Sequence, residues 1–380
     1  MLDFTTTARL TPSSVAIAYS NCSHNTEHIR RIFKASSMPF MLATSCLGAL
    51  HCGPNATEAE SDLSLFFIDD EQGAYGIGSA DLDDKTTTQG DPVKAGAYAL
   101  EQALINANRP FESPALIWCA LPPGDEERIL EGFASVVGEQ VPIFGGSAAD
   151  NTVEGHWFTA TINSCSPNTI AVCVMYPSTP LGLSYSSGYK PTETVFTVTQ
   201  ASGRNLIELD GQPASAIYNS ATNNLIESEL GGGQILGLTS SAPLGKPVAL
   251  ESGALNYLLC HPDQVCEDGS LNVFSEIHQG EQLTLMEGNI DSLTARAERV
   301  INNAIMLLPQ NKKPVGVLMI YCAGCRLMVG DAIRPMIENL KHTFEGLPIC
   351  GAFTFGEQGR FLDGKNRHGN LMISAVVFSR

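Results

Sequence analysis

Two segments of the chain repeat one order of elements, and this repeat limits the folds that the sequence can adopt. Residues 115–151 (ALIWCALPPGDEERILEGFASVVGEQVPIFGGSAADN) and 315–359 (VGVLMIYCAGCRLMVGDAIRPMIENLKHTFEGLPICGAFTFGEQG) each contain an apolar strand, a Gly-containing loop, an amphipathic helix and a second apolar strand. This order predicts a parallel βαβ unit. Because both copies enter the second strand through Pro and leave it through Gly, we interpret them as a duplication.

Weaker signals extend this organisation to the rest of the chain. A third copy opens it, and the pattern between the copies predicts a β-hairpin followed by a helix. Further short strands and loops are expected to decorate the second unit over residues 231–272. The expected elements are strands at 15–19 and 40–44, a helix at 26–35, hairpin strands at 195–199 and 205–209, and a helix at 214–220.

The length of the chain predicts two domains. Its 380 residues exceed the roughly 250–300 at which one hydrophobic core stops growing. We place the boundary where the pattern changes, which gives domains of residues 1–215 and 216–380. The expected fold class is α/β, with two related domains built from βαβ units, mixed sheets and a ligand crevice between the domains.

Charge and composition exclude several partners. The formal net charge is −18 and no Lys/Arg cluster is longer than two residues, so the cationic surface that nucleic acids or anionic membranes require is missing. No apolar stretch approaches 18 residues and the first residues do not resemble a signal peptide, which favours a cytoplasmic protein. Eleven cysteines, an odd number, spread through strands and loops indicate free thiols.

Three Gly-rich loops follow strands of the expected units, at the sheet edge where α/β proteins bind ligands. They are residues 45–50 (SCLGAL), 145–151 (GGSAADN) and 351–359 (GAFTFGEQG). Their glycines permit close backbone approach, although tight turns with solvated side chains are the alternative. With Arg326 from a fourth loop, the candidate ligand-binding residues are Cys46, Gly48, Gly145, Gly146, Ser147, Asp150, Asn151, Arg326, Thr354, Gly356 and Glu357.

The side-chain chemistry of four of these residues suggests their roles. Asp150 and Asn151 would orient a polar ligand. Glu357 would bind an ammonium or hydroxyl group, and Arg326 would bind a carboxylate or propionate. The sequence therefore favours a small ligand with polar or charged groups.

The same loops resemble the motifs of the FIST family. Residues 141–151 (VPIFGGSAADN) resemble the FIST N motif with its Pro-apolar-Gly-Gly-Ser-Ala-Gly-Asp core, and residues 347–359 (LPICGAFTFGEQG) resemble the FIST C motif Gly-Phe-Tyr-Thr-Tyr-Gly-Glu-Ile-Gly. Residues 198–218 are similar to the stretch that ends in Leu-Asp-Gly-x-Pro-Ala, and residues 321–326 to the Cys-Ala-x-Arg stretch. The resemblance covers nearly the whole chain.

The resemblance implies a sensory module of signal transduction that binds a small ligand such as an amino acid. Stand-alone members of similar size are haem-dependent nitric oxide sensors that act on histidine kinases or cyclic-di-GMP enzymes. The resemblance therefore leaves open haem as a cofactor, a histidine kinase or cyclic-di-GMP enzyme as a partner, and a homodimer as the assembly. Asp150 and Glu357 match the motifs, whereas the chain departs from them at Ala149, Ala352, Phe353, Phe355 and Gln358, so the ligand preference does not transfer.

Haem would need an axial ligand, most simply a neutral imidazole in an apolar pocket. His51 directly follows the first Gly-rich loop and His156 lies beside Trp157, so these two histidines are the candidate axial ligands. A surface or structural role is the usual one for any single histidine. His261 and His278 stay open as further candidates.

An enzyme is the alternative class of function. Cys322 and Cys325 form a CxxC, but the Pro or aromatic residue typical of thioredoxin sites is missing and no second CxxC completes a zinc site. We interpret them as structural thiols and expect no metal centre. A hydrolase using Ser147 with His156 as base, or a thiol-dependent enzyme using Cys325, remains the alternative, although no GxSxG, HExxH, Walker loop or GxGxxG is present.

Overall fold

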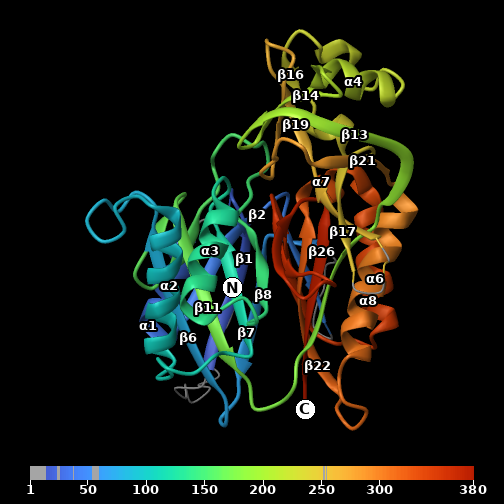
Figure 1. The fold of residues 1–380 in the computed structure, drawn as a ribbon. Helices are drawn as coiled ribbons and strands as arrows, with labels where there is room; N and C mark the ends of the chain where they lie inside the picture. Colours follow the sequence, from blue (N-terminus) through green and yellow to red (C-terminus); the bar gives the residue numbers. More distant parts are fainter. Residues whose placement is uncertain (1–13, 24–25, 37, 54–59, 251–252, 254) are drawn as a thin grey trace.

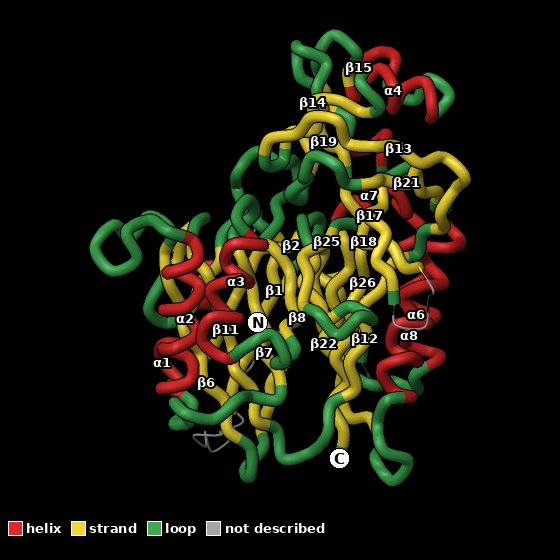
Figure 2. Tube along the Cα trace, viewed as in Figure 1, coloured by secondary structure: helices red, strands yellow, loops and turns green. Residues whose placement is uncertain are grey.

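The computed structural model describes residues 14–23, 26–36, 38–53, 60–250, 253 and 255–380. Figure 1 shows strands in the middle of the molecule, helices α1, α2 and α3 on one side, and helices α6 and α8 on the other. Figure 2 shows the same layers, with helices outside and strands inside. The α/β fold class with mixed sheets is confirmed.

All three expected repeats form βαβ units with parallel neighbouring strands. Their strands are almost fully buried, which explains their near-continuous apolar sequences. In the unit formed by residues 315–359, α7 (Ala323–Val329) and the short helix η2 (Gly330–Ala332) precede the crossover helix. The units are β1 (Ser14–Asn21), α1 (Thr26–Ser36) and β2 (Phe40–Ser45); β7 (Leu116–Leu121), α3 (Glu126–Val137) and β8 (Ile143–Ser147); and β22 (Pro314–Cys322), α8 (Ile333–Thr343) and β23 (Ile349–Thr354).

Two sheets form what we call the N-terminal unit. The first has the order β10-β9-β2-β1-β5 and the second β25-β24-β8-β7-β11-β6. The strands not yet given are β5 (Leu63–Asp69), β6 (Ala74–Asp81), β9 (Thr159–Thr161), β10 (Cys165–Ser166), β11 (Thr169–Tyr176), β24 (Glu357–Arg360) and β25 (Asn366–Gly369). Helices α2 (Pro92–Asn106) and α3 pack on the second sheet, and α1 packs on the first.

Two further sheets form the C-terminal unit. The third sheet has the order β12-β26-β22-β23-β3-β4, and α6 (Ile290–Met306) and α8 pack on it. The fourth has the order β16-β19-β20-β14-β13-β21-β17-β18, with β15 on β14. The remaining strands are β3 (Ala49–Cys52), β4 (Glu60–Ser61), β12 (Gly182–Ser187), β13 (Lys190–Ser202), β14 (Asn205–Leu209), β15 (Gln212–Pro213), β16 (Gly233–Gln234), β17 (Leu244–Ala249), β18 (Leu255–Cys260), β19 (Pro262–Val265), β20 (Leu271–Val273), β21 (Gln282–Glu287) and β26 (Met372–Ser379).

The fourth sheet contains the expected hairpin and helix. Strands β13 and β14 pair antiparallel, and α4 (Ala214–Ala221) follows them as predicted. Helices α5 (Leu236–Thr239) and η1 (Glu227–Glu229) and the short strands β16 to β20 add the predicted decoration. In the described part of the chain, no helix is both long and apolar enough to cross a membrane.

The two units exchange strands. Strands β3 and β4 come from the first 61 residues but pair with the sheet of the C-terminal unit, through β23. Strands β24 and β25 come from the chain's end but extend the sheet of β8. A common core of Tyr19, Trp118, Tyr321, Phe353 and many other apolar residues lies between the sheets. The predicted domain boundary at residue 215 stays a prediction. The chain passes from one unit to the other before this residue, at β3, and again after it, at β24.

Candidate functional site

The three segments predicted as Gly-rich loops meet where the two units contact each other, and we call this contact the Gly-rich junction. Much of the second and third segments forms the strands β8, β23 and β24 and not loops. The Cys46 amide donates to the Phe353 carbonyl at 3.0 Å, and the Ser147 amide donates to the Gly356 carbonyl at 2.8 Å. The Asn151 side chain accepts from the Leu47 amide at 2.6 Å. The structure therefore brings the predicted loops together, as a buried contact between protein groups.

Glycines in this junction make room for side chains of the opposite loop. A Cβ on Gly146 would lie 2.5 Å from Thr354 Cγ2, and a Cβ on Gly356 would lie 2.3 Å from His368 Cε1. Gly145 approaches the Cys119 carbonyl with a φ of +151°. These glycines serve the packing of one motif against the other. The predicted approach of their backbone to a ligand, as for Gly48 in the first loop, stays a prediction.

Asp150 and Asn151 shape the loop that follows β8. The buried Asp150 carboxylate accepts hydrogen bonds from the amides of Thr152, Val153, Glu154 and His156. The side-chain Nδ2 of Asn151 donates to Asn21 Oδ1 at 3.0 Å. Protein groups therefore occupy the polar atoms that we predicted to contact a ligand.

Arg326 lies in α7 beside the Gly-rich junction. Its guanidinium sits 5.7 Å from the centre of the Phe353 ring, and its Nη1 donates to the Gly330 carbonyl at 3.1 Å. Burial raises the pKa of the neighbouring Cys46 thiol to about 12, against the opposing effect of Arg326. Arg326 is half-buried, so its role as a carboxylate clamp stays a prediction.

A chain of hydrogen bonds leads from the Gly-rich junction to the interface between the units. Ser147 Oγ donates to Glu126 Oε1 at 2.7 Å, and Gln358 Nε2 lies 3.3 Å from Ser147 Oγ and 3.1 Å from His368 Nδ1. His368 Nε2 then donates to the Phe274 carbonyl at 3.1 Å. These contacts connect Glu126 and Ser147 with His368 and, through it, with Phe274.

Arg204 neutralises the acidic end of this chain. Its Nη2 lies 2.6 Å from Glu126 Oε2 and 2.5 Å from Glu127 Oε2. Burial alone would raise the pKa of Glu126, but His368, Arg204 and the Ser147 hydroxyl outweigh it and lower the pKa to about 2. His368 and Arg204 also lower the pKa of Glu127, against the effect of burial. Both glutamates are therefore ionised at neutral pH.

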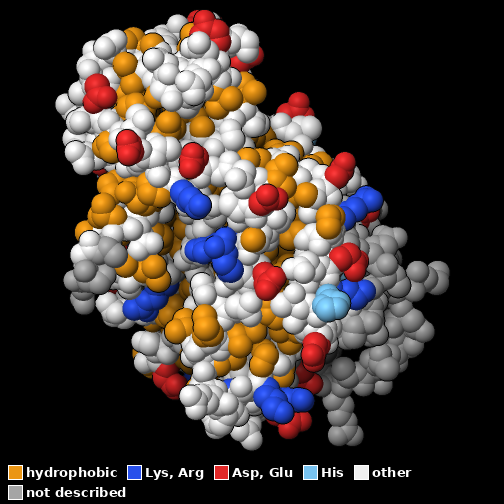
Figure 3. Space-filling model, turned by 90° about the vertical axis from the view of Figure 1, so that its right-hand side faces the viewer, with side chains coloured by type: hydrophobic (Ala, Val, Ile, Leu, Met, Phe, Trp, Pro, Cys, Tyr) orange, Lys and Arg blue, Asp and Glu red, His pale blue; other side chains and the backbone are white. Residues whose placement is uncertain are grey.

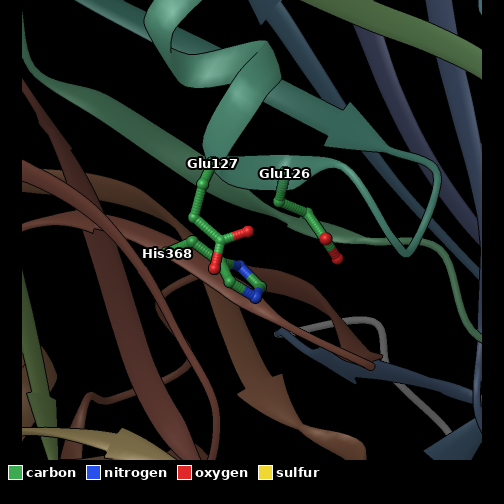
Figure 4. Close-up of side chains that lie close together, drawn as sticks. All are labelled: Glu126, Glu127 and His368. Carbon is green, nitrogen blue, oxygen red and sulfur yellow. The ribbon is translucent and has the colours of Figure 1, made fainter. Parts of the chain in front are cut away.

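Figure 4 shows the carboxylate of Glu127 beside the ring of His368, with the side chain of Glu126 next to them. Their ligand atoms lie within 4.8 Å of one another, close enough for a metal ion. Arg204 already supplies the positive charge there, and both ring nitrogens of His368 have hydrogen-bond partners. These contacts favour a fixed ion-pair cluster over a metal site.

Glu357 has a different environment in the same junction. Its Oε1 accepts from Thr354 Oγ1 at 2.8 Å and its Oε2 accepts from the Met372 amide at 3.0 Å. Burial, with Cys322 as a further contributor, raises the pKa of Glu357 well above its usual range. A neutral carboxyl is the consequence, so the predicted ammonium contact would require this group to ionise.

An open pocket of about 360 Å³ lies beside this network, and we call it the inter-unit pocket. Glu127 and His368 form part of its wall. Its cations are Lys246, Lys365 and Arg367, and its apolar lining includes Leu130, Ile143 and Leu258. Because α3 and β8 belong to the N-terminal unit and β17 to the C-terminal unit, a ligand here would contact both. Its lining residues are Glu127, Leu130, Glu131, Ala134, Glu139, Ile143, Lys246, Leu258, Ser275, Glu276, His278, Glu281, Lys365, Asn366, Arg367 and His368.

The candidate haem ligands lie apart from this pocket. His51 is a half-buried residue of β3 with Nδ1 3.3 Å from Ser64 Oγ, and burial lowers its pKa. The His156 side chain is 71% exposed, beside Glu154. His261 is fully buried, which lowers its pKa to about 3, whereas His278 lines the inter-unit pocket. The axial-ligand assignments stay predictions.

The candidate nucleophiles are buried. Ser147 has no exposed surface, and the carboxylate that accepts its proton has a lowered pKa and is a weak base. Cys325 is also fully buried, and all eleven cysteines are free. The CxxC does open a helix, since Cys322 caps α7, but burial raises the pKa of its thiol. This environment favours structural thiols.

Sequence reasoning missed the group formed by Glu126, Glu127, Arg204 and His368, which we call the charged cluster. Glu126 and Glu127 were visible as acidic residues in the first turn of α3, where they commonly stabilise a helix. Arg204 and His368 carry no local signal, because they lie far away in the sequence. Gln358 was noticed as a departure from the FIST C motif, and the structure shows its hydrogen bonds to Ser147 and His368.

Comparison with known proteins gives few informative relatives. An uncharacterized protein of Methanocaldococcus jannaschii is 33% identical over 95 residues, which cover 24% of this chain and 18% of that protein. A solved structure of cyanuric acid hydrolase from A. caulinodans is 11% identical, with a TM-score of 0.32 and coverage of 98% of this chain and 92% of that chain. A likeness at this score carries no inference about activity.

Family models match most of the sequence. The FIST N domain matches residues 15–212 and the FIST C domain matches residues 225–360. The matched ranges contain the Gly-rich junction, the charged cluster except His368, and most of the inter-unit pocket. FIST domains are sensory domains of signal-transduction proteins, which supports a ligand-sensing role. The chain belongs to the FIST family.

Proposed function

We propose that the protein senses a small zwitterionic metabolite of the amino-acid class, bound in the inter-unit pocket. The observation that carries this proposal is the position of the pocket, between α3 and β25 of the N-terminal unit and β17 of the C-terminal unit. Binding at an interface between two units couples occupancy to their relative arrangement.

The charges of the pocket suit a ligand with both signs of charge. Lys246, Lys365 and Arg367 supply donors for a carboxylate. Glu139 and Glu276 supply acceptors for an ammonium group. The volume of about 360 Å³ lies near the lower end of the roughly 300–1,000 Å³ typical of small-molecule sites. A single small metabolite fits these dimensions.

The hydrogen-bond chain provides a route for the signal. His368 lines the pocket and contacts Gln358, which contacts Ser147 in the Gly-rich junction. A ligand that shifts His368 would change how the two units pack, most simply by opening or closing. We propose that this change regulates a partner protein, a histidine kinase or a cyclic-di-GMP enzyme. The proposed compartment is the cytoplasm, where the eleven thiols stay reduced.

Haem sensing is the second candidate, and it has less support from the geometry. Haem requires a largely apolar slot, whereas the inter-unit pocket contains many charged side chains. Neither His51 nor His156 lines it. A visible spectrum of protein expressed with haem precursor tests this candidate. A stoichiometric Soret band that nitric oxide shifts and that the His51→Ala variant lacks would favour haem over the metabolite.

The test of the proposed site is thermal unfolding with each of the twenty amino acids. One of them should raise Tm, since a ligand at 100 times its Kd stabilises a protein by about 2.7 kcal/mol. The Lys246→Gln variant should lose most of this shift. Lys94→Gln, which removes a Lys ammonium from the exposed surface of α2, is the matched control.

Two results would overturn the proposed site. One is the absence of any Tm shift with all twenty amino acids. The other is an equal shift in the wild-type protein and the Lys246→Gln variant, which would place the ligand elsewhere.

A further inference from the structure

A second pocket of about 280 Å³ lies against α6 in the C-terminal unit, and we call it the α6 pocket. It shares no lining residue with the inter-unit pocket. Figure 3 shows the side of the molecule that carries α6 and α8, where Lys and Arg side chains lie among apolar ones. The α6 pocket is lined by Tyr185, Ser186, Ser187, Gly188, Tyr189, Lys190, Pro191, Leu255, Asn256, Tyr257, Met286, Ser292, Arg296, Arg299, Phe361 and Leu362.

One wall of the α6 pocket presents two arginines from one face of a helix. Ser292, Arg296 and Arg299 are four and three residues apart, so their side chains lie on the same side of α6. Among the described residues, no carboxylate lies within ion-pair distance of either arginine, and Arg296 Nε is buried without a hydrogen-bond partner. Burial and the neighbouring Arg299 lower the pKa of Arg296. Two like charges therefore lie together without an anion.

This pairing is unusual for a chain with a net charge of −18. Carboxylates outnumber cations almost twofold, yet the lining of the α6 pocket contains no Asp or Glu. The pocket also lies beside the first turns of α6, a helix of 17 residues capped by Asn289. The field in this pocket favours an anion.

The opposite wall is apolar and aromatic. Tyr257 and Phe361 line it, and Leu255 and Leu362 are 56% and 65% exposed at its edge. Exposed leucines beside a pocket become buried when an apolar group binds there. The bound molecule would therefore have an anionic end and a flat or apolar end.

We propose that the α6 pocket binds a small organic phosphate, with its phosphate on Arg296 and Arg299 and its apolar or aromatic portion against Tyr257 and Leu362. Paired guanidinium groups match the geometry and double charge of a phosphate monoester. The size of the pocket suits a single nucleotide-sized molecule. Occupancy would change the environment of α6, which packs on α8 and on strands β12 and β26.

The experiment is isothermal titration calorimetry at low ionic strength, with adenosine monophosphate and inorganic phosphate as probes. Adenosine monophosphate should bind saturably at one site, and the double variant Arg296→Gln/Arg299→Gln should weaken it by at least about tenfold, because two charge-assisted contacts are lost. Arg109→Gln, which removes an exposed arginine that lies after the C-terminus of α2, is the matched control and should bind as the wild type does.

A second variant tests the apolar wall. Leu362→Ser should weaken the binding of adenosine monophosphate and leave the binding of inorganic phosphate unchanged. Leu362 is 65% exposed, and a Tm measurement checks that the variant folds. The proposal fails if neither probe binds saturably, if the double variant binds as tightly as the Arg109→Gln control, or if inorganic phosphate binds as tightly as adenosine monophosphate. Amino-acid binding in the inter-unit pocket is measured separately, so the two proposals fail independently.

Discussion

Two glutamates of the molecule, Glu126 and Glu357, are equally buried but carry opposite charge states. Glu126 lies at the start of α3 and has Arg204 and Ser147 as partners. Glu357 lies in β24, where Thr354 and the Met372 amide donate to its carboxyl group and the buried Cys322 thiol lies nearby. The pKa of Glu126 is lowered to about 2, whereas that of Glu357 is raised well above its usual range.

The difference shows that a nearby cation decides the charge state, since burial raises the pKa of both groups. Hydrogen bonds from neutral donors do not compensate for lost hydration at Glu357. The ionised glutamate lies at the pocket side of the network and the neutral one within the Gly-rich junction. The ionised Glu126 is itself buried, and its neighbour Glu127 lines the inter-unit pocket.

Removing the cation should produce the largest effect on this comparison. In Arg204→Gln, Glu126 and Glu127 lose their shared partner, and breaking such a buried ion pair typically costs about 3–5 kcal/mol. Because Arg204 retains some exposure to water, we expect the lower half of that range. Urea unfolding measures the change in the free energy of unfolding.

The control for this variant is Arg128→Gln, whose exposed ion pairs with Asp91 and Glu131 should contribute less than about 1 kcal/mol. Equal losses in the two variants would contradict the assignment of Arg204 as the cation that keeps Glu126 ionised.

Removing the hydrogen bonds that join Ser147 to His368 should have an intermediate effect. Gln358→Ile, which restores the residue of the FIST C motif, removes the donor to Ser147 and to His368 Nδ1. A buried polar group left without a partner costs about 1–3 kcal/mol. Urea unfolding should show this loss, and amino-acid binding should weaken because His368 is no longer held in place. Unchanged stability and binding would remove Gln358 from the proposed signal route.

Replacing the neutral glutamate should have the smallest effect, and the effect should depend on pH. A protonated Glu357 resembles Gln, so Glu357→Gln should change stability by less than about 1 kcal/mol near pH 5. A raised pKa in the folded state makes the wild type lose stability as pH rises above the unfolded value of 4.5, by at most about 1.4 kcal/mol per pH unit. The variant lacks this loss, so its relative stability should increase with pH.

Glu126 makes the free energy of unfolding change with pH in the opposite direction, because its pKa is lowered in the folded state. Its contribution is complete above about pH 4.5 and is lost as pH falls toward 2. Unfolding curves of the wild type, Glu357→Gln and the surface control Glu71→Gln from acid to neutral pH separate the two contributions. A flat difference between Glu357→Gln and the wild type would mean that Glu357 is ionised.

Much of the fold was predictable because the repeated pattern is local. Each strand–helix–strand copy carries its own periodicity and turn residues, and all three formed parallel units where expected. The hairpin at β13 and β14 followed from its turn in the same way. The strand exchange was not predictable, because the pairing of β3 with β23 depends on the packing of segments some 300 residues apart.

The candidate site was predictable only in part. The sequence indicated which loops would meet, and their contacts in the Gly-rich junction agree with that expectation. It did not indicate that Asp150 would be saturated by backbone amides or that Arg204 would reach α3. Such contacts depend on three-dimensional distances between residues that share no local pattern.

The strand exchange described for β3, β4, β24 and β25 also restricts what protein engineers can do with this protein. A chimaera assembled by cutting between the two family-model matches would separate β24 from β8 and β3 from β23. Each fragment would then expose unpaired sheet edges, which promote aggregation. Transplanting the sensor into a new signalling context therefore requires the whole chain as one cassette.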